Sequence, residues 1–230
     1  MALQIQLSTD FSPSAVNFSK LRKNKNGGKT VYLSNNGNQL LLQLPYMRAP
    51  FGLSSFTDEN TKKTSYSLDL SFDPNDPQTQ DLEDKLKALD ELIVETVGNN
   101  SQEWLGKKFN KAVLKEALYK PLVRPNKGEY PSTIKLKILT DLRTGDFVPE
   151  AYNSRRESVP LDSIEKGQKI MTIIDLNQIW FIDNKFGVTA RLKQCLLEPS
   201  KKLPSFAFQG VQTEPEEEEE EDVDEGEVDY

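Results

Sequence analysis

A dense run of basic side chains lies between Trp104 and Arg143. Three acids, Glu116, Glu129 and Asp141, oppose ten cations in this segment, so its local charge is +7. The cations are Lys107, Lys108, Lys111, Lys115, Lys120, Arg124, Lys127, Lys135, Lys137 and Arg143. Most charge runs are only a solvated face, but cations on an ordered surface attract a phosphate backbone. The segment is therefore the first candidate for a site that binds a polyanion.

The later cations of this run lie on segments that should hold them at fixed positions. In TIKLKILT (133–140), apolar residues alternate with Lys135 and Lys137, which predicts a strand with one core face and one basic face. Arg124 and Lys127 precede this strand, beside two prolines and a glycine in a stiff loop. Such an ordered stripe can present cations to a phosphate backbone.

A second candidate is the tryptophan in QIWFIDNKFGVTARLKQCLL (178–197), a predicted hairpin. If the hairpin loop has an even number of residues, Trp180 lies on the polar face, near Thr189 and Arg191. An odd loop would bury the indole instead; we favour the exposed geometry. An exposed indole beside a cation can stack on a nucleobase, which contributes about 1–3 kcal/mol per base.

Groups that could perform catalysis are scarce. The chain has no histidine, which excludes a Ser–His–Asp triad, a His general base and a His-ligated zinc site. Its single cysteine, Cys195, excludes an intrachain disulfide and is expected to be a small core residue. The run Gly28-Lys29-Thr30 resembles the end of a phosphate-binding loop, but Lys23 stands where that motif requires a glycine.

Paired carboxylates are the remaining candidate for chemistry. Four acids lie close together in sequence, at Asp73, Asp76, Asp81 and Glu83. We favour a loop and a helix N-terminus there, because acids interact favourably with the helix dipole. We therefore predict a binding protein with no catalytic residue, no cofactor and no metal site.

Short strands and one helical excursion must position these residues. Strands are expected around the turn signal Asn36-Gly37 (30–46), at 65–72 and at 133–140. A helix is predicted at 79–97, and a second helix follows at about 102–119 with Ser101 as its N-cap. The segments KIMTIIDL and 178–197 should supply the last three strands, and the whole pattern favours a small β-barrel.

The C-terminal end of the chain is opposite in charge to the rest of the chain. The chain holds 29 Lys and Arg against 36 Asp and Glu, a net charge of −7. Residues 214–230 contain 12 of these acids and no cation, which leaves 24 acids, 29 cations and a body of +5. This acidic tail is too charged to fold alone, yet it ends in an aromatic residue, Tyr230.

Composition also gives expectations for the N-terminal region and for the cellular compartment. KLRKNKNGGK (20–29) holds five cations and no acid, so we expect a flexible basic segment over 1–29. No apolar run approaches the roughly 18 residues of a membrane helix, and the N-terminus lacks the pattern of a signal peptide. With one cysteine, the chain is expected to be intracellular.

Four stretches carry a resemblance to a known family. They are PYMRAPFGLSSF (45–56), PLVRPNKGEYPSTIKLKI (121–138), IWFIDNKFGVTARLKQ (179–194) and the acidic tail. In this order they resemble the single-stranded DNA-binding proteins of large nucleocytoplasmic DNA viruses, which are similar to the replicative single-strand binders of the phage T7 type. The resemblance spans roughly residues 30–230. It implies an OB-fold barrel and an acidic tail that competes with DNA and docks on replication partners.

The resemblance also implies roles for individual residues. It assigns phosphate contacts to Arg124, Lys127, Lys135 and Lys137, and stacking to Tyr130, Trp180 and Tyr46. The full set predicted to contact DNA is Lys107, Lys108, Lys111, Arg124, Lys127, Tyr130, Lys135, Lys137, Trp180, Arg191, Tyr46 and Arg48. The set predicted to bind partners through the tail is Glu216, Glu217, Glu218, Glu219, Glu220, Glu221, Asp222, Asp229 and Tyr230.

We therefore expect a mainly β fold. It comprises an OB-fold-like five-stranded barrel, a two-helix excursion and a disordered acidic tail. The expected domains are the basic segment 1–29, a binding domain at 30–200 with its helical insertion at about 79–119, and a linker with tail at 201–230. Tyr230 stands where the phage type has phenylalanine, and the helical pair is longer than a minimal barrel requires.

Two functions are open at this point. The first is sequence-nonspecific single-stranded DNA binding in viral replication, recombination and repair, at replication sites in the host cytoplasm or nucleus. Its partners would be single-stranded DNA or RNA, a DNA polymerase or helicase-primase through the tail, and a second copy in a homodimer, with no membrane. The alternative is a histone-chaperone-like or virion interaction protein whose acidic tail captures basic partners. A nuclease has little support.

Overall fold

The computed structural model describes residues 4–23, 25, 27–199 and 207–210. The chain divides into two compact units, residues 1–200 and 201–230, and all described helices and strands belong to the first. In this described part, no helix is long and apolar enough to cross a membrane. The acidic residues 214–230 and their predicted disorder lie outside the described residues.

Five strands close into a barrel. β14 (Lys169–Ile182) pairs with β6 (Met47–Arg48), and β6 pairs with β8 (Thr64–Ser71). β8 pairs with β11 (Thr133–Ile138), β11 with β15 (Lys185–Leu197), and β15 pairs with β14 again. This closed circuit of backbone pairing confirms the prediction of a mainly β fold with a five-stranded, OB-fold-like barrel.

Alternate residues of the strands fill the barrel interior. On β11 the side chains of Ile134, Leu136 and Ile138 are buried, whereas Lys135 and Lys137 are exposed. The alternation predicted from the sequence is therefore confirmed. The predicted core residue Cys195 is buried as well, and burial raises the pKa of its thiol to about 12.

The last part of the barrel has two long strands where the sequence suggests three. β14 runs unbroken from Lys169 to Ile182, with register shifts against β15 between Ile173/Ile174 and Leu176/Ile179. A β-bulge adds a residue to one strand and bends it without ending it. The polar Asn177 is absorbed at the second irregularity, so it does not break the strand.

The N-terminal region adds strands to the barrel. Residues 5–23, expected to be part of a flexible segment, form short strands that pair with β4 and β5, and Phe11 and Val16 join the core. Burial of these two apolar side chains offsets the cost of ordering the segment. The strands are β1 (Ile5–Leu7), β2 (Val16–Phe18), β3 (Arg22–Lys23), β4 (Lys29–Asn35) and β5 (Leu41–Gln43).

The turn predicted at Asn36-Gly37 is present, but its flanking strands do not form a ladder with each other. Both turn residues have positive φ, as a two-residue hairpin turn requires. Asn35 and Asn38 exchange backbone hydrogen bonds of 3.0 and 2.9 Å. Beyond this turn β4 and β5 separate, and each pairs with a different part of β14.

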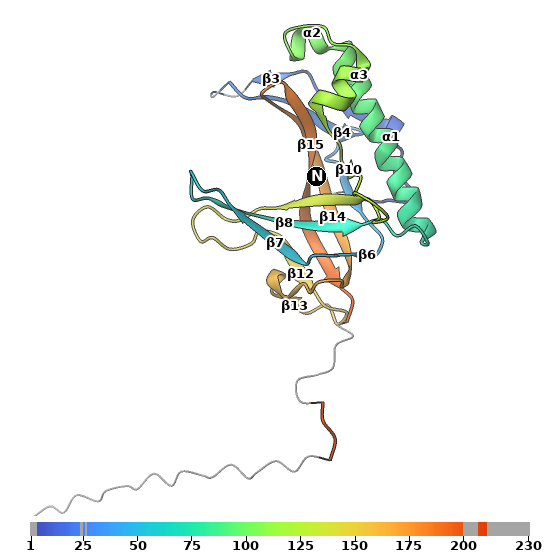
Figure 1. The fold of residues 1–230 in the computed structure, drawn as a ribbon, viewed down its shortest axis with the longest axis vertical. Helices are drawn as coiled ribbons and strands as arrows, with labels where there is room; N and C mark the ends of the chain where they lie inside the picture. Colours follow the sequence, from blue (N-terminus) through green and yellow to red (C-terminus); the bar gives the residue numbers. More distant parts are fainter. Residues whose placement is uncertain (1–3, 24, 26, 200–206, 211–230) are drawn as a thin grey trace, which may run out of the picture. The chain divides into compact units, whose positions relative to one another are not determined.

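A long helix, α1 (Pro77–Asn99), packs against the barrel. It begins at the N-cap Asp76, whose carboxylate accepts a hydrogen bond from the Gln78 N–H at 2.9 Å, and Pro77 occupies the first turn. Its apolar face is buried as predicted, through Leu82, Leu86, Leu89, Ile93 and Val97. In Figure 1, α1 lies on one side of the barrel, and the β3–β4 and β7–β8 strand pairs project from the other.

The second predicted helix is wrong as a continuous element. It consists of α2 (Ser101–Trp104), α3 (Lys111–Val113) and the π-helical turn η2 (Leu114–Leu118). Gly106 has a φ of +85°, which ends the first piece, and Asn110 caps the next by accepting the Val113 N–H at 2.8 Å. Ser101 is the first residue of α2 and not its N-cap; the N-cap position is Asn100, which makes no side-chain cap hydrogen bond.

The remaining elements are short and lie around the barrel. β7 pairs with β8 in a hairpin, while β9 and β12 pair in parallel with β15. β10 pairs with β11, and β13 pairs with β12. Their bounds are β7 (Leu53–Thr57), β9 (Tyr119–Lys120), β10 (Val123–Arg124), β12 (Glu150–Tyr152) and β13 (Ser158–Val159), with single turns η1 (Pro13–Ala15) and η3 (Leu161–Ser163).

Candidate nucleic-acid interface

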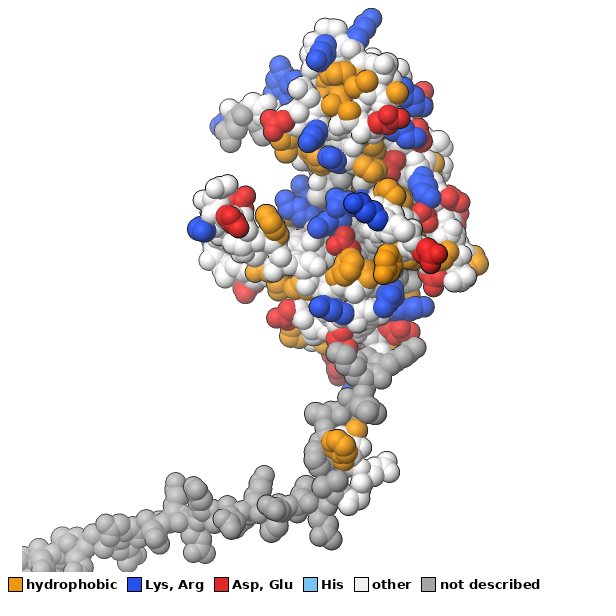
Figure 2. Space-filling view, viewed as in Figure 1, with side chains coloured by type: hydrophobic (Ala, Val, Ile, Leu, Met, Phe, Trp, Pro, Cys, Tyr) orange, Lys and Arg blue, Asp and Glu red, His pale blue; other side chains and the backbone are white. Residues whose placement is uncertain are grey.

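A groove of about 440 Å³ lies where the β7–β8 hairpin meets strands β9, β10, β11, β14 and β15. Four of its lining residues are basic and none is acidic. The basic residues are Lys120, Arg124, Lys135 and Lys137, and the aromatic ones are Phe56, Tyr66 and Trp180. Figure 2 shows Lys and Arg side chains gathered at a hollow between two projecting parts of the surface.

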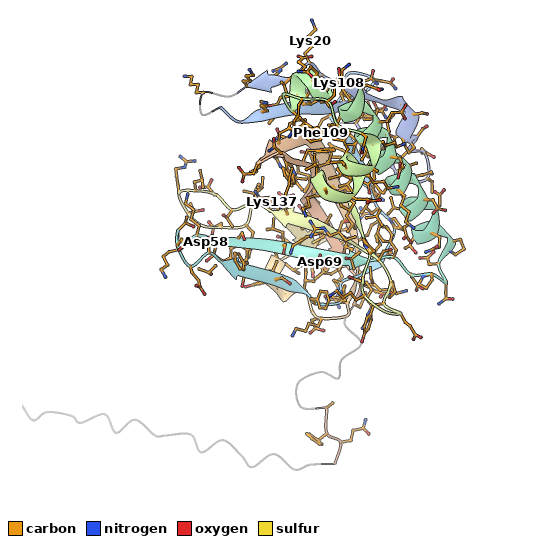
Figure 3. The ribbon with its side chains drawn as sticks, turned by 45° about the horizontal axis from the view of Figure 1, so that its top comes forward. Lys20, Asp58, Asp69, Lys108, Phe109 and Lys137 are labelled. Carbon is orange, nitrogen blue, oxygen red and sulfur yellow. The ribbon has the colours of Figure 1, made fainter. Side chains whose placement is uncertain are left out.

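Strand β11 positions two of these cations. Lys135 and Lys137 alternate with buried residues, so both project from the outer face of the barrel. Their directly opposed residues on β8 are Asp69 and Ser67. Figure 3 marks Lys137 and Asp69 on these two paired strands. Within the described residues neither lysine forms an ion pair, so both amines remain available to an external anion.

The other two cations reach the same face from two very short strands. Arg124 is directly opposite Thr133, which shares a face of β11 with Lys135. Lys120 is opposite Gly187 of β15, and Gly187 is in turn opposite Trp180. Since opposed residues of a sheet point to the same side, cations from three strands and the indole converge on one surface.

The predicted even-loop geometry of the terminal hairpin is confirmed. The loop has two residues, Asp183 and Asn184, both with positive φ, as a type I′ turn requires. Trp180 consequently lies on the polar face and lines the groove with Thr189. Its indole is half-buried, between the two alternatives considered from the sequence.

Because Gly187 has no side chain, the Trp180 indole can pack closely against β15. A Cβ added to Gly187 would lie 2.9 Å from Cζ2 of Trp180 and 2.8 Å from the backbone oxygen of Lys120. Both distances are shorter than any ordinary van der Waals contact. Gly187 therefore lets β9 and the Trp180 ring approach β15 from its two sides, and this brings Lys120 beside the indole.

Two further aromatic residues of the groove were missed by the sequence analysis. Phe56 projects from β7 with its side chain 68% exposed, and Tyr66 of β8 packs edge-to-face on Phe147 at a centroid distance of 5.0 Å. Phe56 is opposite Ser65, which also lines the groove. The signal for Phe56 was its place in a short polar strand, where a large apolar side chain has no core to enter.

A buried carboxylate on α1 holds the segment between Lys120 and Arg124. Asp90, only 8% exposed, accepts hydrogen bonds from the Tyr119 hydroxyl at 2.5 Å and from the N–H groups of Leu122 and Val123 at 3.0 and 3.2 Å. Burial raises the pKa of Asp90 to about 6, against these hydrogen bonds, which act to lower it. Burial also raises the pKa of Tyr119 well above its usual value.

A second acid of α1 holds the entrance to β11. Glu83 accepts a hydrogen bond from the Ser132 hydroxyl at 2.6 Å and pairs with Lys87 at 2.7 Å. Burial opposes ionisation of Glu83, but its hydrogen bonds and the Lys87 charge together lower its pKa. The segment from Leu122 to Ser132 is thus attached to α1 at both of its ends.

The structure does not bring the basic residues of the excursion, which from α2 to η2 covers 101–118, to the groove. Lys107 lies over the ring of Phe109 at 5.0 Å, and Lys111 pairs with Glu91 at 3.6 Å. Lys108 is exposed, and in Figure 3 Lys108 and Phe109 are labelled above Lys137. None of the three lysines lines the groove.

Other residues of the predicted set lie around the groove but do not line it. Lys127 and Tyr130, which is 79% exposed, lie on the loop between β10 and β11. Tyr46 and Arg48 lie at β6, and Arg48 is opposite Ser71 at the far end of β8. Arg191 is closer, since it is opposite Lys137, and its Nε is buried without a hydrogen-bond partner among the described residues.

The residues predicted to bind partners lie outside the described part of the chain. They are Glu216, Glu217, Glu218, Glu219, Glu220, Glu221, Asp222, Asp229 and Tyr230. Their role stays a prediction.

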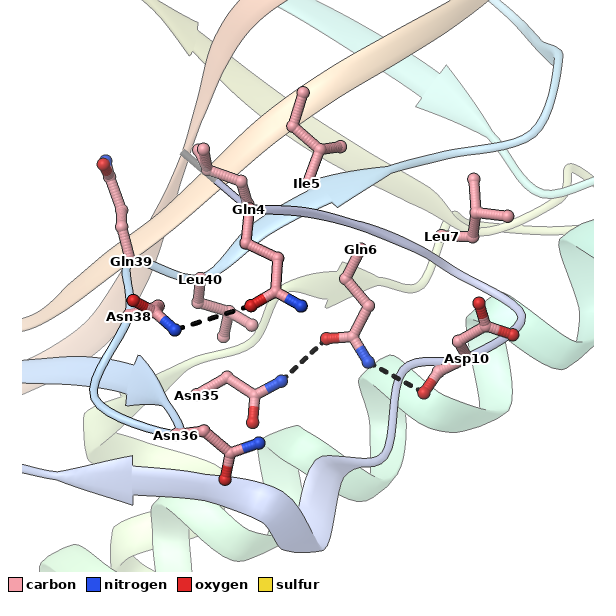
Figure 4. Close-up of a pocket in the computed structure, with 11 residues that line it drawn as sticks. Gln4, Ile5, Gln6, Leu7, Asp10, Asn35, Asn36, Asn38, Gln39 and Leu40 are labelled. Atoms are coloured by element: carbon pink, nitrogen blue, oxygen red, sulfur yellow. Dashed lines mark hydrogen bonds between the residues drawn. The ribbon is translucent and has the colours of Figure 1, made fainter. Parts of the chain in front are cut away.

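A second cavity has a different chemical character. It occupies about 290 Å³ beside β1 and is lined by amide side chains, with Asp10 and no cation (Figure 4). Asn35 donates to Gln6 Oε1 at 2.8 Å, and Gln6 donates to the Asp10 backbone oxygen at 2.8 Å. Its amides are largely engaged with one another, and it offers no positive charge to a phosphate. Within the described residues, no cluster of three or more Cys, Asp or Glu side chains could hold a metal ion.

Comparison with known proteins gives one family and several similar structures. Residues 78–210 match the sequence model of a family of unknown function, DUF5871. No curated protein matches the chain.

Two solved structures from phages are similar in fold. One is gp2.5, a single-stranded DNA-binding protein encoded by bacteriophage T7, with a TM-score of 0.47 and 12% identity over 77% of this chain and 100% of that chain. The other is a single-stranded DNA-binding protein from bacteriophage Enc34 in complex with ssDNA, with a TM-score of 0.39 and 14% identity over 81% and 97% of the two chains. At such identities the role of a residue does not transfer from one chain to the other.

Proposed function

We propose that this chain, which belongs to the family of unknown function DUF5871, binds single-stranded DNA without marked sequence preference and is not an enzyme. One observation carries the proposal: a groove on the barrel combines four cations and a half-buried indole with no acidic residue. A role in viral replication, recombination and repair belongs to the same proposal.

The cations supply most of the affinity in this proposal. Lys120, Arg124, Lys135 and Lys137 neutralise consecutive phosphates, and each neutralised phosphate releases condensed counterions. For single strands, each contact adds about 0.7 to the slope of log affinity against log salt. Four contacts therefore give a slope of about 2.8, and binding weakens steeply as salt rises.

The aromatic residues make single strands the preferred ligand. Trp180 and Phe56 line the groove, and a base that stacks on an aromatic ring gains about 1–3 kcal/mol. In a duplex the base faces are already covered by their neighbours and cannot reach the rings. Since every base has such a face, stacking also explains why no sequence is preferred.

The acidic tail is proposed to compete with DNA and to recruit replication proteins. Residues 214–230 carry closely spaced negative charge and end in a ring, which repeats the chemistry of a single strand. Seventeen residues span at most about 55–60 Å when extended, and the proposal requires that they contact the groove. Such a contact is intramolecular, and its loss should tighten DNA binding.

The direct test is fluorescence anisotropy with a labelled oligonucleotide and with its duplex, over a series of salt concentrations. We expect tighter binding to the single strand and a linear fall of log affinity with log salt. Equal binding to both DNA forms, or binding that does not respond to salt, would exclude the proposal.

The alternative function rests on the tail alone. Its 12 acids suit a histone-chaperone-like or virion interaction protein that captures basic partners. Removal of residues 214–230 separates the two functions. The truncated chain should bind single-stranded DNA more tightly if the first proposal holds, whereas it should lose its activity altogether if the tail is the binding element.

A further inference from the structure

The loop that carries half of the groove cations depends on helix α1 for its position. Lys120 ends β9 and Arg124 ends β10, and each of these strands has only two residues. β9 is registered with β15 at two positions and β10 with β11 at two positions. Strands this short have few ladder hydrogen bonds of their own, so their conformation needs other support.

Asp90 of α1 supplies that support by binding the loop between the two strands. One carboxylate oxygen accepts from the Tyr119 hydroxyl and from the Leu122 N–H, and the other accepts from the Val123 N–H. The three donors are Tyr119, immediately before Lys120, Val123, immediately before Arg124, and Leu122, one of the two residues between the strands. A single side chain therefore holds the Tyr119 side chain before Lys120 and two backbone N–H groups between Lys120 and Arg124.

Burial of a carboxylate at this place costs free energy, which its hydrogen bonds to the loop partly offset. Removal of a charged group from water is strongly unfavourable, and charge-assisted hydrogen bonds offset only part of the cost. The charged groups nearest to it do not neutralise it, since Glu91 and Lys115 pair with each other and Lys87 pairs with Glu83. An apolar side chain at position 90 would bury as much surface but could not order the loop.

We infer that Asp90 is a positioning residue for DNA binding, which holds Lys120 and Arg124 at the groove through the loop between β9 and β10. It does not touch the DNA itself. The inference rests on the proposed function. It means that α1 positions the groove cations in addition to packing against the barrel.

The test replaces Asp90 by asparagine, which keeps the shape of the side chain. In Asp90→Asn an amide NH₂ faces either the Val123 N–H or the Tyr119 and Leu122 donors, so at least one donor loses its acceptor. The loop should then shift and remove up to two phosphate contacts. We expect the salt slope for single-stranded DNA to fall by up to about 1.4, which corresponds to roughly 25-fold weaker binding at 0.1 M salt.

A matched control and a double-mutant cycle distinguish positioning from general effects. Glu95→Gln removes the same charge from an exposed site of α1 and should leave the slope unchanged. In the Lys120→Gln/Arg124→Gln background, Asp90→Asn should add no further loss, because the groups through which it acts are gone. A slope that falls equally in both backgrounds would overturn the inference.

Failure of the inference and failure of the proposed function give different results. If wild-type protein does not bind single strands, the proposed function is wrong. If it binds, and Asp90→Asn lowers only the melting temperature with an unchanged slope, Asp90 is merely structural. Should Asp90→Asn fail to fold, Tyr119→Phe removes one hydrogen bond to the carboxylate and should produce a smaller fall in slope, while an unchanged slope would count against the inference.

Discussion

Eight of the ten cations between Trp104 and Arg143 lie in two different regions of the structure, although all ten form one run in the sequence. The groove cations Lys120, Arg124, Lys135 and Lys137 line a surface with no acid. Three of the four cations of the helical excursion have local partners: Lys111 and Lys115 both pair with Glu91, and Lys107 lies over Phe109. Two segments with a similar density of positive charge in the sequence therefore differ in how many cations are available to an external anion.

The difference lies in the secondary structure that carries each set. A strand sends alternate residues to the same face, so cations from β9, β10 and β11 can meet on one side of a sheet. A short, irregular helix distributes its residues around an axis, and acids of the neighbouring α1 lie within reach. A basic segment becomes a binding surface where register aligns the cations and where no acid forms an ion pair with them.

The largest expected effect comes from removing one whole set. Replacement of Lys120, Arg124, Lys135 and Lys137 by glutamine should lower the salt slope by about 2.8 and weaken single-strand binding several hundredfold at 0.1 M salt. The matched variant replaces Lys107, Lys108, Lys111 and Lys115, with the same change in net charge, and should have a much smaller effect. Similar losses in both variants would show that binding follows net charge and not the groove.

Two adjacent acids of α1 extend the comparison to pH. Asp90 binds the loop between the groove cations Lys120 and Arg124, and Glu91 pairs with Lys111 and Lys115 of the excursion. Burial raises the pKa of Asp90 from 3.8 to about 6, so its contribution to stability is present below pH 4 and is lost as pH rises to about 6. As pH rises through this window, the free energy of unfolding of Asp90→Asn should increase relative to that of wild type, by up to about 3 kcal/mol. Denaturant unfolding at a series of pH values measures this difference.

Glu91 should show the opposite sign. Its hydrogen bond from Lys115 lowers its pKa, so its contribution is present above pH 4.5 and is lost as pH falls further. Because the side chains of this pair are about half exposed, Glu91→Gln should change the free energy of unfolding by less than about 1 kcal/mol. The same sign of pH response in both variants would remove the distinction between the two acids.

The aromatic residues give the next effect. Trp180→Ala should weaken single-strand binding by about 5- to 150-fold, as expected for the loss of one stacked base, with little change in salt slope. Its counterpart in the excursion, Phe109→Ala, should leave binding unchanged. Tryptophan fluorescence offers an independent measurement: of the two tryptophans Trp104 is buried, so quenching by DNA should come from Trp180 and disappear in Trp180→Phe.

Much of the fold could be predicted because its signals are local. The alternation at 133–140 and the apolar spacing of 79–97 each follow from a single period, and the structure confirms both. The face of Trp180 followed from the parity of a two-residue turn. The continuity of β14 across Asn177 could not be predicted, because a bulge depends on the neighbouring strands and leaves no period in the sequence.

The groove was only partly predictable for a related reason. Arg124, Lys135, Lys137 and Trp180 belong to the predicted set and converge in space. The contributions of Lys120 and Phe56 depend on which strands become neighbours, through the pairing of β9 with β15 and of β7 with β8. Those pairings join segments distant in the sequence, and no local pattern specifies them.

The smallest effect concerns Phe56, at the rim of the groove. Its ring is 68% exposed, so a base that stacks on it remains partly in water, and we expect Phe56→Ala to weaken binding only about fivefold, at the low end for stacking. Phe51 provides the matched control, because it is 57% exposed but does not line the groove. Neither substitution removes a buried side chain, so both variants should melt as wild type does. Anisotropy that detects equal losses for Phe56→Ala and Phe51→Ala would show that exposed apolar area, and not a place in the groove, governs the contact with DNA.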